Sequence, residues 1–187
     1  MNLFGKSNFI EVYDNALTEK ECQIIVESFE KSPYQAGYTG LGYRPEAKKC
    51  VQSTYSFSKM NTISNILRTN LIRCMDMYYK KYSALTDVSD FAMYDCYNIQ
   101  KYDGEEDGYK VWHCEHGPEE DSCKRIMAWM FYLNDAQCGT EFKYYPTINA
   151  KMGRCAIWPA FWTHLHKGVI PNKGLKYIAT GWYSHTK

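Results

Sequence analysis

Apolar residues recur at helical spacing in the N-terminal half of the chain. A short alternating stretch at 8–13 is followed by Thr18 and Glu21, the spacing of a capping box that opens a helix. The apolar positions that follow are Cys22, Ile25, Val26 and Phe29. They predict an amphipathic helix over 19–31, and a longer stripe predicts a second helix over 61–84. The apolar positions of that stripe are Ile63, Ile66, Leu67, Leu71, Cys74, Met75 and Tyr78.

The second half of the chain has a different period. Short aromatic and β-branched segments alternate with turn signals such as Asp103-Gly104 and Pro171-Asn172-Lys173-Gly174. They predict strands over 91–102, 109–115, 125–134, 140–145, 153–158, 163–167 and 175–184. Residues 33–56 contain Pro, several Gly and mixed charges, and are predicted to form a long loop. The order of elements indicates an α+β, mainly β fold, with helices on one side of an antiparallel sandwich or barrel.

Composition narrows the class of protein. The 187 residues are 45% hydrophobic, enough to fold, and we expect a single domain over 1–187. The net charge is +1, and the Lys and Arg residues are scattered along the chain. Neither a nucleic acid nor a membrane is therefore expected as an obligate partner. No signal-peptide pattern opens the chain, and we expect a cytoplasmic protein. The eight cysteines form no CxxC pair and are expected to be mostly reduced core residues.

A candidate metal site lies in Trp112-His113-Cys114-Glu115. On a strand, His113 and Glu115 would project from the same face. A His-x-carboxylate pair with a distant histidine can form the facial triad of a non-haem iron(II) oxygenase, which leaves positions open for other ligands. The pair alone is weak evidence, because an edge-strand histidine beside a solvated glutamate has the same pattern.

Two histidines further along can complete the triad, namely His164 and His166. Lys176 follows His166 by ten positions, on the strand expected to end the chain. Alternation places one set of side chains on the inward face of that strand, namely Lys176, Ile178, Thr180 and Trp182. A lysine on an otherwise apolar inward face is costly unless an anion pairs with it.

These motifs resemble the prolyl 4-hydroxylase branch of the Fe(II)- and 2-oxoglutarate-dependent oxygenases. The resemblance is strong over 96–184 and looser before that. It is carried by Lys101-Tyr102-Asp103-Gly104, Gly108-Tyr109, His113-x-Glu115, Tyr132-Leu133-Asn134, Gly139-Thr140-Glu141-Phe142, His166-Lys167-Gly168 and Lys176. It implies a double-stranded β-helix (jelly roll) at about 90–185, supported by helices at about 14–85.

The resemblance also implies roles for individual residues. His113, Glu115 and His166 would bind iron(II), and the spacing to Lys176 favours His166 over His164. Lys176 would pair with the distal carboxylate of 2-oxoglutarate. The remaining residues implied to line the cosubstrate site are Tyr102, Tyr132, Thr180 and Trp182. Dioxygen would be the second cosubstrate, with ascorbate as a candidate reductant.

The chain departs from the family pattern at two places. The carboxylate ligand is usually Asp and here is Glu115, and the usual Gly-Gly pair is Cys138-Gly139. We expect Glu115 to be a variant ligand and Cys138-Gly139 to alter only a turn. Arg125 is expected at the start of its strand, binding surface carboxylates.

The resemblance implies a prolyl residue of a peptide or protein as substrate. Exposed aromatic residues would suit a polyproline II segment. Those expected around the mouth of the site are Tyr34, Tyr38, Tyr43, Tyr109, Trp112 and Trp162. The alternatives are an oxygenase of free amino acids or nucleobases, a zinc hydrolase, and a non-catalytic jelly-roll module. Metal analysis and a succinate-release assay distinguish them.

Overall fold

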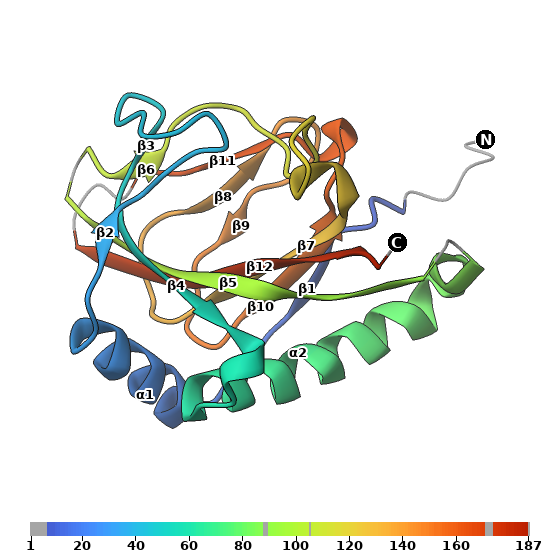
Figure 1. The fold of residues 1–187 in the computed structure, drawn as a ribbon, viewed down its shortest axis with the longest axis horizontal. Coiled ribbons are helices and arrows are strands. Elements are labelled where there is room, and N and C mark those ends of the chain that lie inside the picture. Colours follow the sequence, from blue (N-terminus) through green and yellow to red (C-terminus); the bar gives the residue numbers. More distant parts are fainter. Residues whose placement is uncertain (1–6, 88–89, 105, 171–173, 187) are drawn as a thin grey trace.

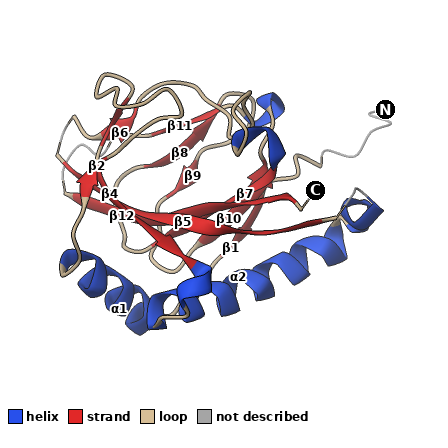
Figure 2. Cartoon of the chain, viewed as in Figure 1, coloured by secondary structure: helices blue, strands red, loops and turns tan. Residues whose placement is uncertain are grey.

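The computed structural model describes residues 7–87, 90–104, 106–170 and 174–186. It contains antiparallel sheets with two long helices along one side (Figures 1 and 2). Most of the turn predicted at 171–174 lies outside the described residues, as do residues 1–6. Neither long helix, nor any other helix of the described part, is long and apolar enough to cross a membrane.

The helices begin and end close to the predicted positions. Helix α1 spans Glu19–Glu30, and Thr18 and Glu21 form the predicted capping box. Helix α2 spans Thr62–Lys81 and is capped by the side chain of Asn61. Single-turn 3-10 helices lie at Phe57–Lys59, Ser83–Asp87, Ser122–Lys124 and Trp162–His164.

The strands form a large sheet and two smaller ones. The large sheet has the order β1-β10-β7-β12-β5-β4-β2, and the smaller sheets are β11-β8-β9 and β3-β6. The strands are β1 Glu11–Tyr13, β2 Gln35–Ala36, β3 Lys48–Lys49, β4 Val51–Ser56, β5 Phe91–Asp103, β6 Gly108–Tyr109, β7 Arg125–Tyr132, β8 Gly139–Phe142, β9 Ile148–Asn149, β10 Cys155–Pro159, β11 His166–Gly168 and β12 Leu175–His185. The α+β, mainly β prediction is confirmed.

Three local predictions were wrong. The strand predicted over 163–167 begins as a 3-10 helix at Trp162–His164, and the strand there, β11, covers only His166–Gly168. Residues 33–56 are not simply a loop, because they contain β2, β3 and β4, and β4 pairs along β5 in the large sheet. The strand predicted over 109–115 ends at Tyr109, and the residues after it lack regular pairing apart from one bridge at His113. For residues 33–56 and 109–115 the pairing partner is distant in sequence, and the periodicity of neighbouring residues does not predict such pairing.

Side chains that alternate along the central strands face two different regions, the apolar core on one side of the sheet and a cavity on the other. On β5, Tyr97 and Ile99 belong to the apolar core shared with α1 and α2. The intervening Asn98, Gln100 and Tyr102 face a cavity on the other side of the sheet. The helices thus cover one face of the large sheet and leave the opposite face to form the site.

A glycine holds the start of α1 against the sheet. Gly153 has a φ of +76°, and its carbonyl accepts a hydrogen bond from the amide of Leu17 at 3.0 Å. A Cβ placed at Gly153 would lie 2.2 Å from the carbonyl oxygen of Leu17. The left-handed backbone and the close approach both require glycine here.

We therefore expect Gly153→Ala to lower the free energy of unfolding by about 1–3 kcal/mol, measured by thermal or urea denaturation. Gly40→Ala is the matched control, because the atom nearest to its added Cβ is a carboxylate oxygen of Glu119 at 3.8 Å. Equal stability of the two variants would contradict this account of Gly153.

Candidate functional site

Two histidines far apart in sequence face each other across a backbone bridge. The amide of His113 donates to the carbonyl of His166 at 3.0 Å, and the amide of His166 donates back at 2.9 Å. The bridge joins the segment after β6 to β11. It brings the imidazole centroids to 4.4 Å from each other.

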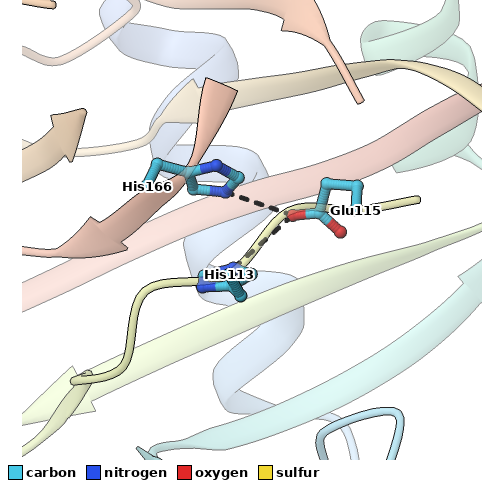
Figure 3. Close-up of side chains that lie close together, drawn as sticks. All are labelled: His113, Glu115 and His166. Atoms are coloured by element: carbon cyan, nitrogen blue, oxygen red, sulfur yellow. Dashed lines mark ion pairs between the residues drawn. The ribbon is translucent and has the colours of Figure 1, made fainter. Parts of the chain in front are cut away.

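Glu115 completes the cluster (Figure 3). Its amide donates to the carbonyl of Ala160 at 3.0 Å, which ties the segment to the end of β10. Its Oε1 lies 3.7 Å from Nε2 of His113 and 3.3 Å from Nε2 of His166. One ligand atom from each of the three residues lies within 4.8 Å of the others. The expected convergence of the three side chains therefore occurs on an irregular segment.

The hydrogen bonds of the imidazoles leave Nε2 available for a metal. Nδ1 of His113 lies 3.1 Å from the carbonyl oxygen of Val111, and Nδ1 of His166 lies 2.9 Å from that of His164. A carbonyl only accepts, so each Nδ1 carries the proton and each Nε2 presents a lone pair.

The protonation states of the cluster also suit metal binding. Burial, and next the nearby His166, lower the pKa of His113 and favour its neutral form. Burial acts to raise the pKa of Glu115, but its contacts with the two histidines outweigh burial and hold that pKa well below its usual range. Two imidazole nitrogens and one carboxylate oxygen fit a divalent first-row metal, with positions left open for other ligands.

The second carboxylate oxygen of Glu115 has its own partners. Its Oε2 accepts a hydrogen bond from Nε1 of Trp182 at 2.8 Å, and Nη1 of Arg125 lies 3.6 Å away. The Arg125 guanidinium also stacks over the Trp182 ring at 3.7 Å. Arg125 therefore lies beside a candidate ligand, and the prediction that it binds surface carboxylates was wrong.

His164 points away from the cluster. Its Nε2 lies 2.8 Å from the carbonyl oxygen of Asn8, and its ring stacks on Tyr145. The side chain is buried in a structural contact. It touches the cluster only through its backbone carbonyl, which holds Nδ1 of His166.

A cavity of about 350 Å³ opens beside the three residues. Lys176, Ile178, Thr180 and Trp182 all line it, as alternation along β12 predicts. Lys176 is only 2% exposed, and burial lowers its pKa. Its Nζ lies 4.4 Å from the centroid of the Tyr102 ring, and no carboxylate of the described residues forms an ion pair with it. Lys176 is thus a buried cation that faces a cavity without a protein anion.

All four of the other expected cosubstrate residues are hydrogen-bonded. Tyr102 donates to Gln100 and Trp182 donates to Glu115. Thr180 lines the cavity but donates its hydroxyl to the carbonyl of Trp129 at 2.8 Å. Tyr132 is fully buried and is not among the residues that line this cavity; its hydroxyl lies 2.6 Å from Oγ1 of Thr140, which does line it. Tyr132 therefore reaches the site through Thr140.

Sequence reasoning did not single out several polar residues of the cavity wall. Lys48 and Gln52 come from the segment that was expected to be a loop, and Asn98 and Gln100 lie on β5. The residues that favour strands in this segment, Val51, Thr54 and Tyr55, are the signal that could have identified β4.

Aromatic side chains surround the site unevenly. Tyr109 stacks on the His113 ring at 3.5 Å and lines the cavity. Tyr38 and Tyr43 are exposed and lie 5.9 Å from each other, and Tyr38 also lines the cavity. The exposed fraction of Trp162 is 69%, so that side chain has little packing.

Comparisons with known proteins agree with this geometry. Residues 97–184 match the model of the 2OG-Fe(II) oxygenase superfamily. No curated protein matches the chain in sequence.

Solved structures share the fold at low identity. The chain is similar to the viral collagen prolyl hydroxylase of Paramecium bursaria Chlorella virus-1, with a TM-score of 0.71 and 18% identity over 95% of this chain and 97% of that one. A Trichoplax adhaerens prolyl hydroxylase in complex with a hypoxia inducible factor peptide fragment matches with a TM-score of 0.73 and 15% identity. That match covers 95% of this chain and 84% of the Trichoplax chain. A Pseudomonas putida prolyl-4-hydroxylase matches with a TM-score of 0.70 and 10% identity over 97% of this chain and 95% of that one.

The match covers the candidate metal residues and Lys176, and the described structure places all four around one cavity. Residues 97–184 thus match the 2OG-Fe(II) oxygenase superfamily model, and the chain shares the fold of the three prolyl hydroxylase structures.

Proposed function

We propose that the chain is an Fe(II)- and 2-oxoglutarate-dependent dioxygenase that hydroxylates a prolyl residue of a peptide or protein. One observation carries the proposal. Nε2 of His113, Oε1 of Glu115 and Nε2 of His166 converge beside a cavity that also contains the buried cation of Lys176. A zinc hydrolase has no need of such a cation.

In this proposal His113, Glu115 and His166 hold the iron. Iron(II) and 2-oxoglutarate, when bound, supply the oxygen-activating chemistry, in which 2-oxoglutarate is decarboxylated to succinate. The protein orients the groups: the two Nδ1–H donors fix the imidazoles, and Trp182 and Arg125 fix the outer oxygen of Glu115.

Lys176 binds the distal carboxylate of 2-oxoglutarate. Its low exposure keeps water away from the ion pair, which makes the interaction stronger than at the surface. The Tyr102 ring lies against the ammonium and holds it in place.

The prolyl substrate is supported by the fold and by the aromatic residues at the site. The Trichoplax relative is a prolyl hydroxylase with a bound peptide fragment, on a similar fold. In this chain Tyr38, Tyr109 and Trp182 line the cavity and offer ring faces against which a pyrrolidine can pack.

Replacing a metal-binding histidine should empty the site. We expect His113→Ala and His166→Ala to lose iron(II), because the two ligands that remain bind it weakly. His164→Ala should lower stability yet retain the metal, since its imidazole binds Asn8 instead. Metal content after equilibrium dialysis measures this, with circular dichroism as the check on folding. Metal loss in His164→Ala alone would reverse the ligand assignment.

Removing the charge of Lys176 should impair cosubstrate binding. Lys176→Met keeps most of the volume but loses a charge-assisted interaction of about 1.5–3 kcal/mol, so the KM for 2-oxoglutarate should rise roughly tenfold or more. Lys143→Met is the matched control, because Lys143 is exposed and does not line the cavity. An unchanged KM in Lys176→Met would refute the assignment.

The substrate class is tested with paired peptides. Enzyme, iron(II), ascorbate and 2-oxoglutarate are incubated with proline-containing peptides and with the same peptides carrying Ala in place of Pro. Mass spectrometry should find one added oxygen atom in the proline peptides only. Succinate release stimulated solely by free amino acids or nucleosides would reject the peptide substrate and leave the oxygenase assignment in place.

A further inference from the structure

The cavity contains a second buried lysine. Lys48 lies on β3 opposite Tyr109 of β6, and it is 5% exposed. Its side chain belongs to the cavity wall. Removing an ammonium from water is costly unless an anion compensates its charge.

The partners of Lys48 are neutral. Its Nζ donates to Oε1 of Gln52 at 2.7 Å and to the carbonyl of Tyr38 at 3.1 Å. No carboxylate of the described residues forms an ion pair with it. A neutral donor could anchor the Tyr38 segment equally well, so anchoring does not account for a charge at this position.

The proposed cosubstrate does not supply the missing anion. One end of 2-oxoglutarate chelates the metal, and its distal carboxylate pairs with Lys176. A divalent metal, Glu115, dianionic 2-oxoglutarate and Lys176 balance in charge. Of the other charged residues that line the cavity, Arg125 lies beside Glu115, and Glu119 and Asp121 are exposed to solvent. Lys48 then remains as a buried positive charge within the same cavity.

The neighbouring amides have their oxygens occupied. The Oε1 atom of Gln52 accepts from Lys48, and Oδ1 of Asn98 accepts from the Thr54 hydroxyl at 2.7 Å. The Tyr102 hydroxyl donates to Oε1 of Gln100 at 2.6 Å.

Each amide is therefore left with an NH₂ group that can donate. Gln52 and Gln100 are cross-strand partners, with Asn98 two residues away on β5. All three line the cavity with Lys48. This part of the cavity wall offers three amide donors and one cation, which matches a ligand that only accepts.

We infer that Lys48, Gln52, Asn98 and Gln100 form an anion subsite that binds a carboxylate of the substrate. The inference rests on the proposed function, because it treats Lys176 as occupied by 2-oxoglutarate. The carboxylate has two possible sources, the α-carboxylate of a terminal residue or an acidic side chain beside the oxidised residue.

The test measures binding of small acids to the loaded protein. N-acetyl-L-proline, N-acetyl-L-aspartyl-L-prolinamide and neutral N-acetyl-L-prolinamide are titrated by calorimetry into the chain with iron(II) and 2-oxoglutarate under argon. At least one acid should bind more tightly than the neutral amide. The tighter of the two acids identifies the source of the carboxylate.

Lys48→Gln is the informative variant, because it can still donate to the Tyr38 carbonyl but carries no charge. It should weaken the acid roughly tenfold or more and leave the neutral amide unchanged. Lys49→Gln is the matched control, since Lys49 is the exposed neighbour on β3 and pairs with Glu106.

Gln100→Glu provides a second, independent variant. It places a negative charge in the subsite and should abolish acid binding. Equal affinity of the wild-type chain for acid and amide, or an unchanged affinity in Lys48→Gln, would overturn the inference.

These outcomes separate the subsite from the proposed function. Acid binding that depends on Lys48, without any hydroxylated product, would refute prolyl hydroxylation and keep the subsite. Hydroxylation of neutral proline peptides with a KM that Lys48→Gln does not change would support prolyl hydroxylation and refute the subsite.

Discussion

Two backbone hydrogen bonds between His113 and His166 are the constraint on which the site depends. They connect a segment that otherwise lacks regular strand pairing to β11, and so fix the separation of two imidazoles from distant parts of the chain. Glu115 follows two residues later and is tied to Ala160. Backbone hydrogen bonds, rather than long side chains, thus set the geometry of the candidate metal site.

The longer carboxylate of Glu115 is accommodated by its surroundings. One oxygen faces the histidines, and the other is held by Trp182 and lies near Arg125. An extra methylene adds rotamer freedom, and these two partners restrict it. Arg125 and Trp182 stack on one another, so the support is itself well packed.

The sequence allowed good prediction where the signal is local. The capping box at Thr18 and the apolar stripe of α2 depend on neighbours within one or two turns, and the helices were placed within a few residues. The inward face of β12 followed from alternation, which brought Lys176 and Trp182 to the cavity. The spacing to Lys176 that the family resemblance implies favoured His166 over His164.

Features that depend on distant partners were missed. Strand β4 pairs with residues of β5 that lie 40 to 50 positions further along the chain, and its mostly polar side chains resemble those of a loop. Lys48 and Gln52, which line the cavity, were therefore not predicted as site residues. The environment of Arg125 depends on Trp182 and Glu115 meeting in space, and no short-range pattern reports that contact.

The central claim is that His113, Glu115 and His166 hold one iron(II) that a 2-oxo acid can chelate. The most direct measurement is an anaerobic titration of iron(II) into the chain with 2-oxoglutarate, followed by the visible charge-transfer absorption of the chelate. The account predicts an absorption that saturates at one iron per chain and is absent from His113→Ala and His166→Ala variants that remain folded. Lack of the absorption in the wild-type chain, or its persistence in both folded variants, would contradict the account.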